Sequence, residues 1–275
     1  MTVEQEVVRH YTHGALADAV LDALLASGKD IERLSSADLW SVDEFHLGWH
    51  AATVDLVDNL DLCRHMHVLD VGAGLGGAAR YMAKTWGCRV TGIDLTAEYV
   101  SVANSLTRRC GLADIVSFQQ ASALDLPYGE GVFDAATLIH VGMNVPDKAR
   151  LFSEVRRVLK PEGCFGVYDV VSVAEGGLSY PMPWAATAEM SFLEPVQSYR
   201  QLLTASGFLV EREHDKTALA LKLGREMREK VVQHGPPPLG IHLLMGSAAF
   251  QRIGNMMTAL ENGVIAPVML IARAV

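Results

Sequence analysis

The chain has 275 residues, of which half are hydrophobic and a fifth are charged, so it is long enough for one large domain, or a domain with a cap, around a sizeable core. Its formal net charge of −9 and the lack of any apolar run near the ~18 residues of a membrane helix argue against nucleic-acid and membrane partners. The polar start lacks the apolar block of a signal peptide, and the four scattered cysteines lack metal-ligand spacing, so we expect a cytoplasmic monomer or homodimer that needs no metal.

Residues 1–66 are expected to form a helical N-terminal cap. Apolar residues recur at helical spacing over 16–25, and a second short helix is expected over 51–60. Between them lie His46 and His50, whose i,i+4 spacing suits a metal pair on one helix face. With no acidic or cysteine partner at fixed spacing, we interpret them as pocket or surface histidines.

The stretch VLDVGAGLGG, residues 68–77, joins an apolar run to a glycine-rich turn and a helix-like segment. A strand, a tight loop and a helix N-terminus in this order bind nucleotide-like ligands at the end of a parallel sheet. Gly72 and Gly74 suit the turn because they adopt positive φ and let a ligand approach the backbone. The spacing also fits G-x-G-x-x-G, so a dinucleotide site and a nucleoside site of another kind both remain open.

VLDVGAGLGG as a whole resembles the first motif of the class I S-adenosylmethionine (SAM)-dependent methyltransferases. In that family an acidic residue at the place of Asp70 lies beside the methionine part of SAM. A dinucleotide-binding strand is usually apolar right up to its glycines, so Asp70 favours the SAM site. The resemblance implies an α/β fold, a doubly wound seven-stranded and mostly parallel sheet whose last strand enters antiparallel between the fifth and sixth.

Two later strand ends extend this site. The strand 90–94 ends in Asp94, which lies 20 residues after Gly74, where a carboxylate can accept both ribose hydroxyls of a nucleoside; a local role as a helix cap is the alternative. After the strand 116–121, the turn beginning Ser122-Ala123-Leu124 resembles the family's adenine-binding segment, in which Asp usually stands at the place of Ser122. A hydroxyl accepts without charge, so we expect that contact to be weaker.

The remaining chain alternates strands and helices, with two irregular or inserted parts. We expect a SAM-binding domain over 67–275 that contains a substrate loop at 172–194 and a helical insertion at 216–263. The expected elements are a fourth strand from Phe133 to near His140, a helix over 151–159, a fifth strand over 164–171, a helix over 195–205, a sixth strand over 207–214 and a last strand over 264–275.

From about residue 8 to its end, the chain resembles the bacterial sarcosine/dimethylglycine-like methyltransferases. The resemblance rests on DEFHLGWHAA, VLDVGAGLGG, VTGIDLT, IHVGMNVPDKARLFSEVRRVLKPEG and PPPLGIHLLMG. Where relatives carry His-Ile-Gly-Gly-Arg-Glu-Ala, this chain has Trp49 for the second Gly and His50 for the Arg, which removes an obvious carboxylate partner for an amino-acid acceptor. Trp49, Tyr168, Tyr180 and Trp184 are expected instead to form an aromatic wall, suited to an amine or a flat ring.

The resemblance implies methyl transfer from SAM, with S-adenosylhomocysteine (SAH) as product, to a small-molecule acceptor, and we expect an amine nitrogen. The alternatives are O- or C-methylation of an aromatic or quinone-like metabolite, an NAD(P)-binding oxidoreductase and a non-catalytic SAM-binding protein. His140 is the expected general base, or else a residue that orients SAM. Tyr11 is expected to close over the site.

The expected site residues follow from these motifs. The cofactor set is Tyr11, Leu47, Gly48, Asp70, Gly72, Ala73, Gly74, Asp94, Leu95, Ser122, Ala123, Leu124 and His140, and the acceptor set is Trp49, His50, Met143, Asn144, Tyr168, Trp184 and His242.

Overall fold

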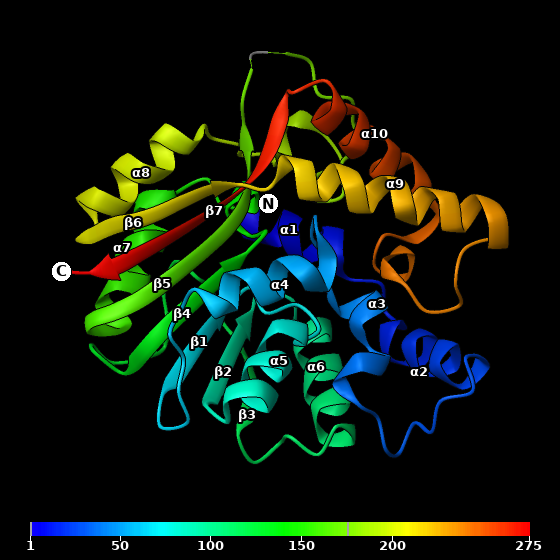
Figure 1. Cartoon of the computed structure of the whole chain (residues 1–275), viewed down its shortest axis with the longest axis horizontal. Coiled ribbons are helices and arrows are strands. Elements are labelled where there is room, and N and C mark those ends of the chain that lie inside the picture. Colours follow the sequence, from blue (N-terminus) through cyan, green and yellow to red (C-terminus); the bar gives the residue numbers. More distant parts are fainter. Residues whose placement is uncertain (1, 175) are drawn as a thin grey trace.

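The structure, a computed structural model, describes residues 2–174 and 176–275; residues 1 and 175, which fall in the predicted cap and the predicted substrate loop, lie outside the described residues. A seven-stranded sheet runs through the molecule with helices on both of its faces (Figure 1). Its strands are β1 (His67–Val71), β2 (Arg89–Asp94), β3 (Val116–Gln120), β4 (Phe133–Ile139), β5 (Leu159–Ser172), β6 (Phe208–Asp215) and β7 (Ile265–Ala274).

The strands lie in the order β3-β2-β1-β4-β5-β7-β6. All are parallel except β7, which runs antiparallel between β5 and β6. The order reverses between β1 and β4, and doubly wound sheets bind their ligands beside the carboxyl ends of the strands at such a point. The predicted fold class is therefore confirmed, including the position of the last strand.

Five helices pack on the sheet, three on one face and two on the other. They are α4 (Trp49–Asp58), α5 (Gly77–Trp86), α6 (Ala97–Arg109), α7 (Lys148–Val158) and α8 (Val196–Ala205). The apolar sides of α4, α5 and α6 share one core with the sheet, and those of α7 and α8 share the other. Helix α4 lies inside the predicted 1–66 cap, yet Ala52 and Leu56 are fully buried against the sheet. That part of the segment belongs to the sheet layers rather than to a cap.

The fifth strand begins earlier than the sequence indicates. We expected it at Cys164, after a break at LKPEG, but α7 ends at Val158 and the chain enters β5 at once. Leu159 pairs with Phe133, and the register shifts before the pairing resumes at Cys164. Glu162 takes a positive φ of 62° in this stretch, so the expected turn survives as an irregularity inside the strand.

The carboxyl edge of the sheet is covered by segments from both ends of the chain. The N-terminal ones are α1 (Val3–Tyr11), α2 (Leu16–Ala26), η1 (Ser36–Asp38) and α3 (Trp40–Asp43); the C-terminal ones are α9 (Thr217–His234), η4 (Ile241–Leu244), η5 (Gly246–Ala248) and α10 (Ala249–Glu261). Leu16 and Val20 of α2 share a core with Leu239 and Leu244. Figure 1 accordingly places α2 and α3 (blue) on the same side of the molecule as α9 and α10 (orange to red).

A buried ion pair fixes the N-terminal cap to the sheet layers. The Arg80 guanidinium of α5 lies 2.6 Å from the Asp43 carboxylate of α3, and both side chains are almost fully buried. Gly77, at the start of α5, leaves room for this pair, because a Cβ there would lie 2.6 Å from the Asp43 Cβ. The cap is thus joined to the helix that follows the glycine loop.

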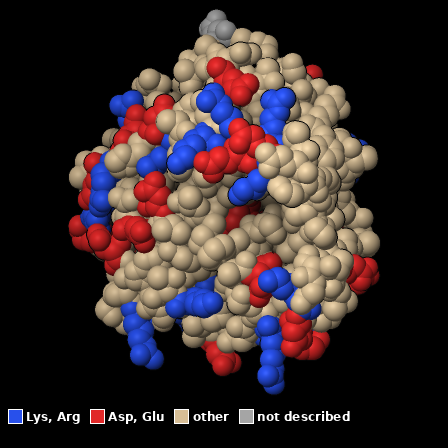
Figure 2. All heavy atoms as spheres, turned by 45° about the vertical axis from the view of Figure 1, so that its right-hand side comes forward, with Lys and Arg blue, Asp and Glu red and all other residues tan. Residues whose placement is uncertain are grey.

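On the face in Figure 2, acidic and basic side chains are interspersed. Within residues 2–174 and 176–275, no helix is long and apolar enough to cross a membrane.

Candidate active site

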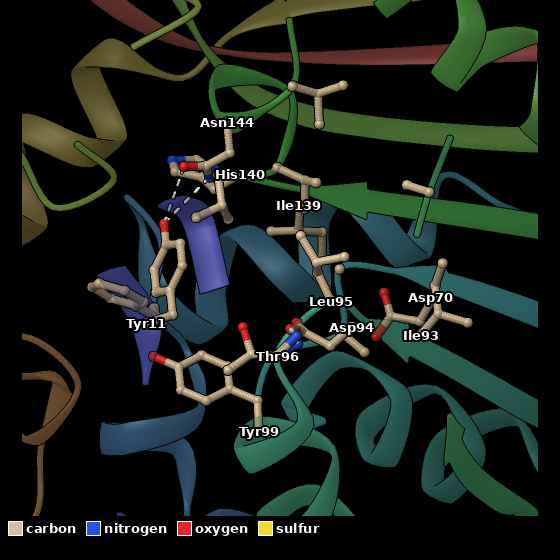
Figure 3. A pocket seen from close by; sticks show the side chains of 18 of the residues that line it. Tyr11, Asp70, Ile93, Asp94, Leu95, Thr96, Tyr99, Ile139, His140 and Asn144 are labelled. Atoms are coloured by element: carbon tan, nitrogen blue, oxygen red, sulfur yellow. Dashed lines mark hydrogen bonds between the residues drawn. The ribbon is translucent and has the colours of Figure 1, made fainter. Parts of the chain in front are cut away.

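A cavity of about 350 Å³ lies at the carboxyl ends of β1, β2 and β4 (Figure 3). Eleven of the predicted residues line it. They are Tyr11, Asp70, Gly72, Ala73, Gly74, Asp94, Leu95, Ala123, Leu124, His140 and Asn144. We refer to it as the cofactor cavity.

The glycine loop forms one wall of this cavity. Gly72 and Gly74 have positive φ values of 71° and 55°, a region that residues with a Cβ enter only with strain. A Cβ at Gly72 would also overlap the side chain of Val141, whereas a Cβ at Gly74 would meet no protein atom within 4 Å. Gly72 therefore allows close packing of two loops, and Gly74 leaves open space beside the backbone.

Asp70 presents a buried carboxylate oxygen to the cofactor cavity. Its Oδ1 accepts a hydrogen bond from the Thr137 hydroxyl at 2.7 Å, while Oδ2 is buried and has no hydrogen-bond partner among the described residues. Burial raises the pKa of Asp70 to about 6. A buried polar atom without a partner is costly, and a cationic ligand group would remove that cost.

Asp94 is held in place by two backbone groups. Its Oδ2 accepts from the Gly74 N–H at 3.0 Å and its Oδ1 from the Thr96 N–H at 2.8 Å. Burial raises its pKa. The Thr96 bond stabilises the turn that leads into α6, but Thr96 and not Asp94 is the N-cap residue of that helix. A carboxylate has about four lone-pair sites, so it can still accept hydroxyl groups of a ligand.

Both ring nitrogens of His140 are already engaged. Nε2 accepts from the backbone N–H of Leu47 at 3.2 Å, and Nδ1 lies 3.2 Å from the carbonyl oxygen of Tyr168. A carbonyl only accepts, so Nδ1 carries the proton and Nε2 does not. Burial, with a smaller contribution from nearby His46, holds the pKa of His140 well below its usual value. His140 is thus a neutral ring bound on both sides.

The sequence did not reveal the partner of His46 and His50. Glu44, almost fully buried, lies 2.8 Å from His46 Nε2 and 3.0 Å from His50 Nδ1, and it accepts from the Thr53 hydroxyl at 2.6 Å. Burial alone would raise the pKa of Glu44, but these hydrogen bonds outweigh it and lower the pKa to about 2. The two histidines share this carboxylate, which the search for metal-ligand spacing did not find.

A second, larger cavity of about 650 Å³ adjoins the first. Its walls come mainly from α9, α10 and the segment 236–245, with Trp49, Met143 and Trp184 on the sheet side. We call it the acceptor chamber. The residues that line both cavities are Tyr11, Phe45, His46 and His140. Figure 3 shows the Tyr11 hydroxyl turned toward Asn144, with which it forms hydrogen bonds of 3.2 and 3.4 Å.

The other predicted residues are divided between the two cavities and the surrounding structure. Leu47 lines the acceptor chamber, as do Trp49, Met143, Trp184 and His242. Asn144, expected in the acceptor set, lines the cofactor cavity instead. The residues that line neither cavity are Gly48, His50, Ser122 and Tyr168.

Packing and hydrogen bonds within the protein explain why these four residues line neither cavity. Tyr168 is fully buried and donates its hydroxyl to the Leu47 carbonyl at 2.8 Å, so it supports the loop from beneath. His50 stacks on Trp40 with ring centroids 3.7 Å apart. Gly48 packs against Ala52 at the start of α4. Ser122 is bonded to Glu4 of α1. Of the four residues expected to form an aromatic wall, Trp49 and Trp184 line the chamber, whereas Tyr168 and Tyr180 do not.

Several lining residues escaped the sequence analysis. Glu4, Phe45 and Tyr99 line the cofactor cavity, and Met227, Phe250 and other side chains of α9 and α10 line the chamber. Tyr99 lies five residues after Asp94, in the first turn of α6, which is a local signal. Nothing local marks the others, because they reach the site only through the folding of distant segments.

The sheet order with an antiparallel β7, together with a carboxylate-rich cavity at the switch point, is the arrangement of the class I SAM-dependent methyltransferases. Residues 69–167 match a family model described as a methyltransferase domain. The chain is 26% identical to the sarcosine/dimethylglycine N-methyltransferase of Halorhodospira halochloris over 83% of this chain and 84% of that protein. Residues 69–167 therefore form a class I SAM-dependent methyltransferase domain, as predicted.

Other relatives differ in their acceptors. A sterol 24-C-methyltransferase, ERG6B of Gibberella zeae, is 39% identical over 42% of this chain and 30% of its own length. The chain spans less than half the length of several such curated relatives. Among solved structures, the [4+2]-cyclase SpnF is 25% identical with a TM-score of 0.69 over 100% of this chain and 97% of that one. A geranyl diphosphate methyltransferase in complex with GPP and sinefungin has a TM-score of 0.74 over 99% of both chains at 19% identity.

Proposed function

We propose that this protein transfers a methyl group from SAM to an apolar small molecule held in the acceptor chamber. The observation that carries the proposal is the junction of the two cavities at Tyr11, Phe45, His46 and His140. SAM, when bound, supplies an electrophilic methyl group on a sulfonium. A cofactor cavity that opens into a separate chamber lets this group meet an acceptor away from bulk water.

The residues of the cofactor cavity fit SAM group by group. The free Oδ2 of Asp70 suits the ammonium of the methionine part, because a buried carboxylate is best satisfied by a cation. Asp94 has lone pairs left for the ribose hydroxyls. Leu95 and Leu124 provide apolar surface for the adenine ring. The space beside Gly74 leaves the backbone free to approach the ligand.

The chamber supports an acceptor that is large and apolar. Its volume of about 650 Å³ lies within the ~300–1,000 Å³ of typical small-molecule sites. Its charged lining residues, Arg225, Arg228 and Glu261, are exposed, so they suit the mouth rather than the interior. A zwitterionic amino acid would lose its hydration there without gaining partners.

The apolar interior of the chamber favours O- or C-methylation of an apolar metabolite over methylation of a small polar amine. The similarity to a sterol C-methyltransferase and to a geranyl diphosphate methyltransferase accords with this preference. An apolar amine also fits, because the faces of Trp49 and Trp184 attract cations. The nitrogen atom of a compound such as sarcosine is the less favoured acceptor.

Positioning is the main contribution of the protein to the reaction. Both nitrogens of His140 are bonded, and those of His46 face Glu44 and the Leu47 carbonyl. His140 has no free lone pair for an acceptor proton, and His46 is bonded to the Glu44 carboxylate, so we assign both histidines to positioning. Orientation alone is worth roughly 7–11 kcal/mol in well-aligned reactions.

Titration calorimetry tests the cofactor and the acceptor class together. SAM and SAH should bind with one site per chain, and NAD should not bind. Apolar ring compounds should then bind the SAH complex, whereas glycine and sarcosine should not. Binding of NAD in place of SAH would contradict the proposal, and so would an SAH complex that binds only polar amines.

The full-length similarity to SpnF supports a second candidate. In that case the chamber would orient an unsaturated apolar substrate for ring closure, and the SAM methyl group would stay in place. Mass spectrometry separates the two, because methyl transfer adds one CH₂ to the acceptor, and ring closure leaves its mass unchanged.

A further inference from the structure

The adenine end of the cofactor cavity lacks the acidic side chain that the sequence comparison would place at residue 122. The Ser122 hydroxyl donates its proton to the Glu4 carboxylate and accepts the N–H of Leu124 at 3.0 Å. Its single proton and one lone pair are thus committed within the protein. Ser122 does not line the cofactor cavity, although Ala121, Ala123 and Leu124 on either side do so.

Glu4 brings a carboxylate to this place from the other end of the chain. It lies in the first turn of α1 and lines the cofactor cavity together with Val3 and Val7. Only its Oε1 bonds to Ser122, and Oε2 has no hydrogen-bond or ion-pair partner among residues 2–174 and 176–275. The Glu4 carboxylate therefore lies at the cavity beside the loop after β3, although the loop residues that line the cavity, Ala121, Ala123 and Leu124, carry none.

We propose that the Glu4 carboxylate accepts a hydrogen bond from the exocyclic amino group of adenine. Glu4 would then perform the role that an acidic residue at the place of Ser122 has in related methyltransferases. Ser122 acts as a positioning residue, since its hydroxyl fixes the Glu4 carboxylate. This inference rests on the proposed binding of SAM. Adenine carries an N–H donor at this edge, and a carboxylate is an acceptor only, so the pair is complementary.

The proposal links adenine recognition to the position of α1. The same helix carries Tyr11, bonded to Asn144, and His10, whose Nε2 lies 2.9 Å from the Pro183 carbonyl. Helix α1 therefore contacts the loop after β4, the predicted substrate loop and the loop after β3. A carboxylate on this helix reaches the adenine edge only when the helix is docked, so the purine itself stabilises the docked state.

The test compares two ligands that differ only at positions 1 and 6 of the purine. In S-inosyl-L-homocysteine N1 carries a hydrogen and a carbonyl replaces the amino group of adenine; a carboxylate placed to accept from that amino group repels the carbonyl. Wild-type protein should prefer SAH by roughly 10- to 100-fold in Kd, the range for a hydrogen bond to a charged group. Glu4→Gln should lose most of this preference, because its amide can donate to the carbonyl as well as accept.

Two further variants serve as controls. Glu6→Gln removes the same charge from the same helical turn but does not line the cavity, so the wild-type preference should persist. Adding Ser122→Asp to Glu4→Ala restores a carboxylate from the loop, and the preference for SAH should return.

The ratio of the two Kd values decides the inference. If Glu4→Gln weakens the binding of both ligands equally and the wild-type ratio of Kd values is retained, Glu4 only docks the helix. That result would overturn the adenine contact. An unchanged ratio and unchanged affinities would overturn it as well. Failure of the wild-type protein to bind SAH would instead refute the proposed function, so the two failures are distinguishable.

Discussion

The side chain of His140 accepts a hydrogen bond from the backbone N–H of Leu47. This bond joins the loop after β4 to the segment before α4, and it fixes the tautomer of a ring that lines both cavities. His140 has a positive φ of 53°, and its own N–H donates to the Tyr168 carbonyl at 2.7 Å. A strained backbone held by two bonds is typical of a residue that must keep one position.

His140→Ala should lower turnover without recovery at high pH. The ring has no free lone pair, so its loss removes positioning and not proton transfer. It also leaves the Leu47 N–H unpaired, and the free energy of unfolding should fall by about 1–3 kcal/mol. Measurement of kcat against pH for wild type, His140→Ala and His140→Asn checks this. Activity of both variants that returns above the pKa of the acceptor would make His140 a general base.

Asp70→Asn should weaken SAH binding while stabilising the unliganded protein. The folded-state pKa of about 6 exceeds the ordinary value of 3.8, so the folded state binds this proton more tightly. That contribution to stability is full below pH ~4 and is lost as the pH rises through about 6. At pH 7 the free energy of unfolding of Asp70→Asn should therefore exceed that of the wild-type protein by on the order of 2 kcal/mol.

The same carboxylate predicts the pH dependence of binding. An ionised Asp70 pairs with the ligand ammonium and a protonated one does not, so wild-type SAH affinity should fall below pH ~6. Asp70→Asn should bind weakly at all pH values. Calorimetry from pH 5 to 8 measures both trends. A variant that binds SAH as tightly as wild type at pH 7 would remove the ammonium contact.

Gly72→Ala and Gly74→Ala form a matched pair in the glycine loop. Both place a Cβ at positive φ, at a cost of about 1–2 kcal/mol, but only the first overlaps Val141. Gly72→Ala should destabilise the unliganded protein more, and Val141→Ala in that background should recover the difference. Urea unfolding checks this. Equal destabilisation by the two glycine variants would contradict the close packing of the loops.

Ile253→Trp should fill part of the acceptor chamber. Ile253 lies on α10 and lines the chamber, whereas Gln251 on the same helix is exposed and does not. The first variant should lower kcat/KM for an apolar acceptor by roughly 10- to 200-fold with the SAH affinity unchanged. Gln251→Trp should behave as wild type. Equal effects of the two variants on kcat/KM would place the acceptor elsewhere.

The sequence predicted what is local in the site. Asp70, Gly72 and Asp94 stand at fixed distances from strand ends, so topology alone brings them to one edge of the sheet. The position of β7 between β5 and β6 was predicted from the family resemblance. Hydrophobic periodicity also predicted α2 within one residue of its observed ends.

The rest depends on contacts between distant segments. Glu4 reaches Ser122 across most of the N-terminal half of the chain, and no spacing rule relates the two residues. His50 was expected at the acceptor because it replaces an arginine of relatives, yet Trp40 and Glu44 hold it away. The chamber arises from the packing of α9 and α10. The amphipathic pattern of a helix predicts that one face is buried, but not which segment it packs against or what cavity forms there.

Transfer of an isotopically labelled methyl group tests the central claim most directly. Protein would be incubated with methyl-labelled SAM and a mixed panel of apolar ring compounds, polyprenyl compounds and small polar amines, and the products analysed by mass spectrometry. The account predicts label in an apolar product, lost in Asp70→Asn and reduced in Ile253→Trp. Label found only in polar amines such as sarcosine, or no transfer by a protein that binds both SAM and an apolar compound, would contradict it.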